Sequence, residues 1–281
     1  MRGGTRCLAI AFCGAALWGQ GAGDLMVGPT RIILEGRTRS AEVTLVHRGK
    51  ARATYRIGFV EMDMTEAGNL VERPRREGER SAADLVRFSP RQIDLEPGIA
   101  QTVRMQARLP EGLPPGEYRS HLVFRALPPG DLATALGGAN QQAQEAKTLS
   151  VAVFPIYGIS IPIILRHGKT HAEVRLEALR VEASVNPKDP KAPPGLVLQL
   201  HREGNRGEYG EVAVSRVEAS GRELPLGLAK GVAIYNNLAK RLLTVPIGKA
   251  GQAGTLKGRL KASFTPLGAK QPSSTAFLDL P

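Results

Sequence analysis

The stretch Thr148–Leu165, TLSVAVFPIYGISIPIIL, contains 18 residues without a charge. Its odd positions carry nearly all of the large apolar side chains, namely Leu149, Val151, Val153, Pro155, Tyr157, Ile159, Ile161, Ile163 and Leu165. In an extended chain alternate residues point to the same side, so this parity predicts a single apolar face. The length would suit a membrane helix, but Pro155, Gly158 and Pro162 and the many Val and Ile residues favour β-strands.

The two prolines of this stretch indicate that it is not one continuous strand. Neighbouring residues of a strand send their N–H groups to opposite sides, and Pro155 and Pro162 differ in parity, so each side lacks one donor. We therefore expect a break near Gly158, with 149–157 as the half that contacts a partner and 159–165 as the half that stays in its own domain. By pattern alone, the apolar face serves either as core or as a partner surface.

The N-terminus has the features of a secretory signal. Two arginines within the first six residues precede an apolar run from Cys7 to Trp18 and small residues up to Gly23. This order predicts that residues 1–23 are removed on export and that the mature chain begins near Asp24. Both cysteines of the sequence lie in this segment, so we expect no disulfide in the mature protein.

The rest of the chain predicts an all-β fold. Short runs rich in Val, Ile, Leu, Thr, Tyr and Phe recur between Gly, Pro and Asn turns, which is typical of β-sandwiches. The clearest predicted strands are Thr30–Leu34, Ser40–Val46, Thr54–Glu61, Val86–Ser89, Gln101–Arg108, Tyr118–Ala126, Leu196–Leu200, Glu211–Glu218, Arg241–Val245 and Thr255–Ser263. Length and pattern predict two domains, residues 24–166 and 170–281, joined by a hinge at 166–169.

The sequence carries no motif for catalysis or for a cofactor. It contains no Gly-x-Ser-x-Gly elbow, no phosphate-binding glycine loop and no cysteine nucleophile in the mature chain, so we expect neither an enzyme nor a bound cofactor. His167 and His171 have a metal-like spacing, but Gly168 lies between them in the expected hinge, so no metal site is predicted.

The charge balance is basic, with a formal net charge of +12 for the full sequence. The basic residues are scattered, apart from two clusters at 73–76 and 257–261. The few aromatic residues do not interleave with these clusters, and the chain is exported, so a nucleic-acid partner is not expected. The clusters are either solvated surface or a site for an acidic partner.

Several motifs, taken in their order along the chain, resemble one known family. Pro29-Thr-Arg31-Ile-Ile-Leu34 comes first. It is followed by Val86-Arg-Phe-Ser-Pro90, Ile93-Asp-Leu-Glu-Pro-Gly98, Gly116-Glu-Tyr-Arg119 and Leu122-Val-Phe-Arg125. This series is similar to the periplasmic pilus-assembly (fimbrial) chaperones of Gram-negative bacteria, the PapD-like family. The resemblance covers about residues 26–166 and is only general beyond them.

The resemblance implies two immunoglobulin-like sandwiches with a cleft between them. Chaperones of this family bind pilin-like subunits by lending a strand to the subunit's incomplete fold, before assembly at an outer-membrane usher. An Arg on the first strand and a Lys on the last strand of the first domain hold the subunit's C-terminal carboxylate. The residues implied here for subunit binding are Arg31, Leu149, Val151, Val153, Tyr157, Ile159 and Ile161. The Lys is missing, because 148–165 contains none and the family's position falls near Pro162.

The resemblance therefore predicts a periplasmic chaperone with a cleaved signal peptide and no integral membrane segment. The alternative is an exported β-sandwich protein of the adhesion or scaffold type, which binds an acidic partner through its basic surface. The alternative predicts binding that falls steeply with added salt, whereas a chaperone depends on the apolar face at 149–157.

Overall fold

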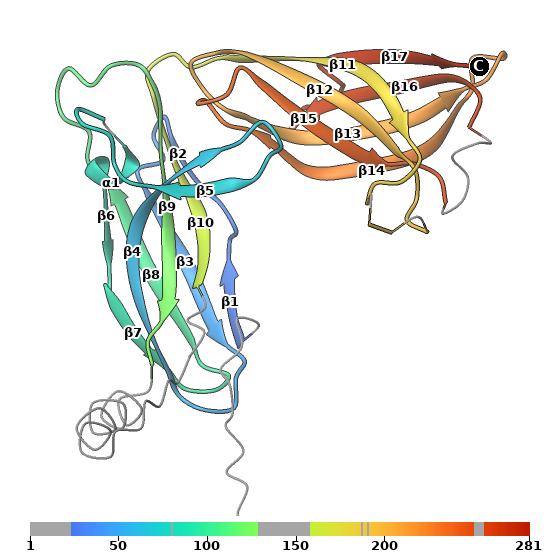
Figure 1. Ribbon diagram of the computed structural model, residues 1–281. Coiled ribbons are helices and arrows are strands. Elements are labelled where there is room, and N and C mark those ends of the chain that lie inside the picture. Colours follow the sequence, from blue (N-terminus) through green and yellow to red (C-terminus); the bar gives the residue numbers. More distant parts are fainter. Residues whose placement is uncertain (1–23, 80, 129–157, 187, 190, 250–255) are drawn as a thin grey trace, which may run out of the picture.

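The protein folds as two all-β domains (Figure 1). The computed structural model describes residues 24–79, 81–128, 158–186, 188–189, 191–249 and 256–281. The domains meet at one end, so the molecule has the shape of an L with an inner angle between its arms (Figure 1). Within these residues no helix has the length and apolar composition needed to cross a membrane. The predicted signal segment lies outside the described residues.

The first domain is a sandwich of two sheets. One sheet has the order β1-β3-β8-β6, formed by Leu25–Gly28, Ser40–His47, Ala100–Ala107 and Val86–Ser89. The other has the order β2-β10-β9-β4-β5, formed by Ile32–Glu35, Gly158–His167, Gly116–Ala126, Ala53–Met64 and Leu70–Arg73, and β7 (Gln92–Leu95) also pairs with β4. A single helical turn, α1 (Ala82–Leu85), precedes β6.

The second domain is also built from two sheets. Its three-stranded sheet has the order β11-β12-β15, formed by Ala172–Glu182, Gly195–Gly204 and Lys240–Pro246. Its four-stranded sheet has the order β14-β13-β16-β17, formed by Glu223–Ile234, Glu208–Val217, Gly258–Pro266 and Ser274–Leu280. Each domain has its own apolar core between its sheets, which is the arrangement that the alternating pattern predicts.

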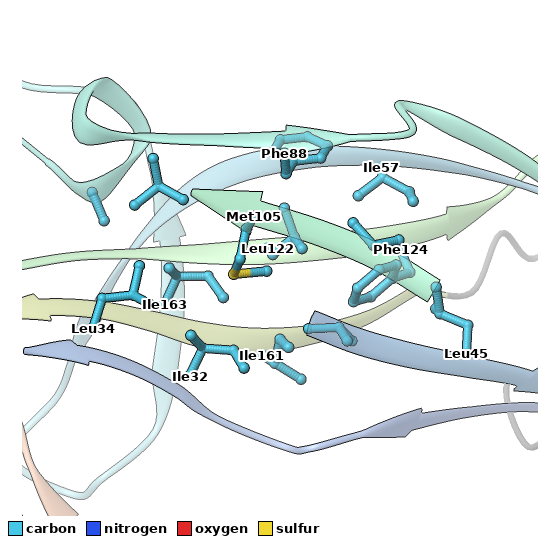
Figure 2. Close-up of a cluster of buried hydrophobic side chains, with 14 of the residues drawn as sticks. Ile32, Leu34, Leu45, Ile57, Phe88, Met105, Leu122, Phe124, Ile161 and Ile163 are labelled. Atoms are coloured by element: carbon cyan, nitrogen blue, oxygen red, sulfur yellow. The ribbon is translucent and has the colours of Figure 1, made fainter. Parts of the chain in front are cut away.

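The alternation of the sequence explains how the first core forms. Val43 and Leu45 of β3 are fully buried, and Val103 and Met105 of β8 lie in the same cluster. Figure 2 shows that β10 contributes Ile161 and Ile163 to this core, beside side chains of the other sheet. The predicted strands of both domains are confirmed to within a few residues at their ends. The strands that were not predicted are β1, β5, β7, β11, β14 and β17.

The expected hinge at 166–169 falls at the end of β10, which ends at His167, and in the short link to β11, which begins at Ala172. A second connection is made by the turn between β4 and β5, which reaches the outer edge of β15 (Figure 1). There the backbone N–H of Leu242 donates to the carbonyl of Glu66 at 2.7 Å. The Asn237 side-chain amide also donates to the Met64 carbonyl at 3.0 Å. The two domains are therefore joined by this turn as well as by the chain between β10 and β11.

Candidate binding site in the cleft between the domains

The strand β10 has an edge that is only partly paired. Along its whole length, from Gly158 to His167, it pairs antiparallel with β9. On its other side the parallel partner β2 covers only Ile163 to Arg166. The edge of Gly158–Pro162 therefore has no partner strand among the described residues. An unpaired edge is a template for an added strand.

The side chains of this unpaired part belong to the first domain. Ile161 is only 2% exposed and lies in the core, and Ile159 packs against the same cluster. The expectation that 159–165 stays in its own domain therefore agrees with the structure. Ile159 and Ile161 were both assigned to subunit binding. A partner strand can reach their backbone edge, but it cannot reach the buried side chain of Ile161. The other assigned residues of this stretch, Leu149, Val151, Val153 and Tyr157, lie outside the described residues.

Arg31 lies at the junction of the two domains. It directly precedes β2, and its guanidinium carbon is 3.1 Å from the centre of the Tyr209 ring in the second domain. Burial lowers the pKa of Arg31, and the neighbouring Tyr209 partly opposes that shift. Arg31 forms no ion pair with a carboxylate in the described part of the chain, and arginine stays protonated under all ordinary conditions. It is thus a half-buried cation whose described partner is an aromatic ring.

A second arginine, which the sequence did not single out, lies close by on β9. The guanidinium carbon of Arg119 is 3.6 Å from the centre of the Tyr235 ring, again in the second domain. Arg119 also donates from Nη2 to Glu117 Oε1 at 2.5 Å. The alternation within β9 could have identified Arg119 as a residue outside the core. Leu122 and Phe124 point into the core, so Arg119 and His121 lie on the opposite face.

Glu117 joins several of these groups. Its side chain is fully buried, and its second oxygen accepts from Arg166 Nε at 3.2 Å. Arg166 also pairs with Glu35 at 3.3 Å. The backbone of Glu117 bonds two loops of the second domain, because its N–H donates to the Asn205 carbonyl and its carbonyl accepts from the Asn236 amide. Glu117 therefore ties β9 to β10 and to the second domain at one point.

The two second-domain loops at this point are organised by Arg202, which is 9% exposed. Its guanidinium donates four hydrogen bonds, of 2.8 to 3.1 Å, to backbone carbonyls. The acceptors are the carbonyls of Leu238, Gly204, Arg206 and Asn236. Burial is the main cause that lowers the pKa of Arg202. One buried cation thus holds together the backbone that faces Glu117.

His121 forms a further buried contact across the domain boundary. Its Nε2 lies 3.0 Å from the Tyr235 hydroxyl, and the two rings are stacked with their centroids 5.9 Å apart. Its Nδ1 is buried and has no hydrogen-bond partner. Burial first, and the Arg119 charge second, lower the pKa of His121 to about 4. At neutral pH this ring is therefore uncharged.

Arg31, Arg119 and the two tyrosines on which they stack line a small pocket between the domains, with a volume of about 20 Å³. The first domain contributes Arg31, Ile33, Arg119, Ile164 and Arg166, and the second contributes Gly207, Glu208, Tyr209, Ala233 and Tyr235. This space is the size of one water molecule, so it receives the end of a ligand and not a whole small molecule. Glu208 is already paired with Arg206 at 3.0 Å. With three arginines in its walls, the pocket favours an anionic group.

The two basic clusters noted in the sequence are paired with acidic side chains. Arg73 bonds both Asp63, at 2.9 Å, and Glu79, and Arg76 also pairs with Asp63. In the other cluster Lys261 pairs with Glu223 at 2.6 Å. Since acidic groups lie beside these cations, neither cluster presents a purely positive surface. This weakens the reading of the clusters as a site for an acidic partner.

Comparison with known proteins finds likeness only at the level of structure. No family model matches the chain, and no curated protein matches it in sequence. The chain resembles fimbrial chaperones in fold. The YadV chaperone is 13% identical, with a TM-score of 0.45, over 91% of this chain and 100% of that one. The class 5 fimbriae chaperone CfaA is 12% identical, with a TM-score of 0.44, over 92% and 99%.

The E. coli chaperone DraB is likewise 12% identical, with a TM-score of 0.40, over 92% of this chain and 96% of that one. Likenesses at this level say nothing about what this chain binds. The groups that bear on binding are the unpaired edge of β10 and the arginines at the domain boundary.

Proposed function

We propose that this protein is a periplasmic chaperone that binds and stabilises pilus or fimbrial subunits by donating a strand, before their assembly at an outer-membrane usher. One observation carries the proposal. The strand β10 has an edge without a described partner strand at Gly158–Pro162, and near its other end it carries Arg166, which lies in the wall of the cationic pocket. A subunit that pairs with this edge would therefore run toward a site that favours an anion.

Residues 149–157 supply the apolar part of the grip in this proposal. Leu149, Val151, Val153 and Tyr157 share one parity with Ile159 and Ile161, so an extended chain presents them on a single face. Burial of each such side chain in a subunit groove contributes roughly 1.5–3 kcal/mol before ordering costs. The backbone of Ile159 and Ile161 continues the edge, while their side chains remain with the first domain.

Arg31 binds the subunit's C-terminal carboxylate in this proposal. It is half-buried, it lines the pocket, and it forms no ion pair in the described part of the chain. A partly solvated arginine–carboxylate pair contributes about 1 kcal/mol or less. The apolar strand therefore accounts for most of the affinity, and Arg31 sets the register of the subunit along the cleft.

Export to the periplasm belongs to the same proposal and rests on the signal-like residues 1–23. The alternative, an adhesion or scaffold protein with an acidic partner, is favoured by no observation at the two basic clusters, because both contain ion pairs. Salt dependence separates the two functions, since an apolar strand resists added salt and a surface of charges does not.

The test is co-expression with a pilin-like subunit, followed by co-purification. The double substitution Val151→Asp with Val153→Asp is expected to abolish capture while the chaperone stays folded, because it places two charges in the apolar groove. The matched control is Leu228→Asp with Leu267→Asp, two exposed apolar residues of the second domain, which should leave capture unchanged. Undiminished co-purification of the 151/153 variant would refute the donor assignment.

A further inference from the structure

Each of the two arginines in the first-domain wall of the pocket rests on a tyrosine of the second domain. Arg31 lies over Tyr209 at 3.1 Å, and Arg119 lies over Tyr235 at 3.6 Å, measured from the guanidinium carbon to the ring centre. A guanidinium that stacks on a ring uses its face for that contact and keeps its N–H groups in the plane free for an acceptor. The stacks therefore orient in-plane donors of both arginines. Arg119 already donates from Nε and Nη2 to Glu117 Oε1, which leaves its Nη1 group for a ligand.

The tyrosines are themselves held in place. The Tyr235 hydroxyl lies 3.0 Å from His121 Nε2, and the Tyr235 side chain is only 5% exposed. Tyr209 lies against Gly231 of β14, where an added Cβ would lie 3.1 Å from the tyrosine hydroxyl. The Tyr209 ring therefore has a close neighbour on β14 in addition to Arg31. The rings are therefore fixed supports for the arginines.

The surrounding acidic groups do not neutralise Arg31 and Arg119 completely, so these two arginines keep an excess of positive charge. Glu117 divides its two oxygens between Arg119 and Arg166, and Arg166 also contacts Glu35. The carboxylate of Glu208 forms an ion pair with Arg206. Arg31 forms no ion pair in the described part of the chain. An oxyanion in the pocket would therefore meet Arg31, which pairs with no carboxylate among the described residues. It would also meet Arg119, which shares the Glu117 carboxylate with Arg166.

We propose that Arg119 is the second cationic contact for the bound carboxylate and that Tyr209 and Tyr235 are the positioning residues for the two arginines. This inference rests on the proposed function, because that function identifies the ligand as the carboxylate at the end of a subunit chain. It accounts for the absence of lysine from 148–165: the second cation comes from β9, where Arg119 lies directly across from Ile164 of β10. It also makes the second domain part of the carboxylate site.

The test uses a defined small probe, so that it does not depend on any subunit. N-acetylphenylalanine supplies a chain-end carboxylate, its amide is the uncharged analogue, and N-acetylaspartate α-amide supplies a side-chain carboxylate. We expect the arginine Nε resonances of Arg31 and Arg119 to shift in NMR titrations with N-acetylphenylalanine and not with its amide. The side-chain probe is expected to bind more weakly than the chain-end probe.

Substitutions then separate positioning from simple structural support. Tyr209→Leu and Tyr235→Leu should each weaken the acid probe roughly three- to fivefold by loss of the cation–π contact, while the Phe variants, which keep the ring, should stay within about twofold. Arg119→Met should remove about tenfold or more of the acid-over-amide preference, and Arg119→Lys should restore part of it. Arg125→Met is the matched control on β9, because Arg125 pairs with Glu72 outside the pocket.

The outcomes distinguish this inference from the function on which it rests. If the protein captures subunits but the acid and the amide affect Arg31 and Arg119 alike, or if the Leu and Phe variants behave alike, the inference is overturned and the proposed function stands. Equal binding of the side-chain probe overturns the assignment to a chain end. If the arginines respond as expected but no pilin-like subunit is captured, the proposed function fails and the anion site remains.

Discussion

The guanidinium of Arg31 lies 3.1 Å from the centre of the Tyr209 ring, although 177 positions separate the two residues in the chain. The contact crosses from the residue that directly precedes β2 in one domain to the strand β13 of the other. It places the arginine that the sequence had singled out in a wall of the pocket between the domains. Binding at Arg31 is therefore linked to how the two domains sit against each other.

Replacement of that arginine should affect binding far more than folding. Arg31→Ala is expected to weaken subunit capture by up to about fivefold, because a partly solvated ion pair contributes about 1 kcal/mol or less. The unfolding free energy should change little, since Arg31 bonds no carboxylate among the described residues. Affinity for a co-expressed subunit and a thermal melt measure the two effects. A large loss of stability with unchanged capture would contradict the role given to Arg31.

Arg202 should behave in the opposite way. Arg202→Met removes the donor to four backbone carbonyls from a buried position, so we expect the second domain to lose about 3 kcal/mol or more of unfolding free energy. Arg175→Met, which removes an exposed pair with Glu203, is the matched control and should cost at most about 1 kcal/mol. Denaturant titrations of both variants give the comparison. Similar losses for the two variants would show that the carbonyl contacts of Arg202 contribute little.

His121 should make stability depend on pH. Its pKa in the folded protein is about 4, below the ordinary histidine value. The unfolded chain therefore binds the proton more readily, so stability is complete above about pH 6.5 and is lost as the pH falls toward 4. The loss attributable to this residue is about 3 kcal/mol, from a shift of roughly 2.5 pKa units.

The measurement is the unfolding free energy at pH 7, 5.5 and 4 for the wild type and for His121→Gln. The carboxylates Glu79 and Asp84, whose pKa values are lowered mainly by hydrogen bonds from arginine, also destabilise the fold as they become protonated. The difference between the two proteins isolates the contribution of His121. An equal pH dependence in wild type and variant would exclude His121 as its source.

The turn that connects the first domain to β15 can be tested with a pair of glycines. Gly68 and Gly78 both have positive φ, +84° and +69°, so alanine is strained at either position by about 1 kcal/mol. At Gly68 the added Cβ would also collide with the guanidinium of Arg241, which is held by the Ala233 carbonyl, whereas Gly78 has open space.

We therefore expect Gly68→Ala to cost about 1 kcal/mol more than Gly78→Ala and to loosen the contact between the domains. Denaturant titration measures the first effect and small-angle scattering the second. Equal costs, with no change in overall dimensions, would show that this turn does not support the junction.

Much of the fold followed from short-range pattern. The alternation in Ser40–His47 placed Val43 and Leu45 in the core, and the turn at Pro97-Gly98 led into β8, where Val103 and Met105 are buried. The short strand β5 was missed, because its residues Leu70–Arg73 show no alternation between buried and exposed positions. The ion pairs of the two charge clusters could not be predicted, because the partner of an exposed cation can come from any neighbouring loop.

The sequence by itself determined that the protein is all-β, where most strands lie, and which face of each strand is buried, because alternation is a property of neighbouring residues. It also marked Arg31, through its motif, and showed that a lysine was missing. Only the tertiary structure decided what surrounds Arg31. Arg119, Tyr209 and Tyr235 meet there because two separate domains pack together, and no periodicity within one strand specifies which side chain lies across a domain boundary.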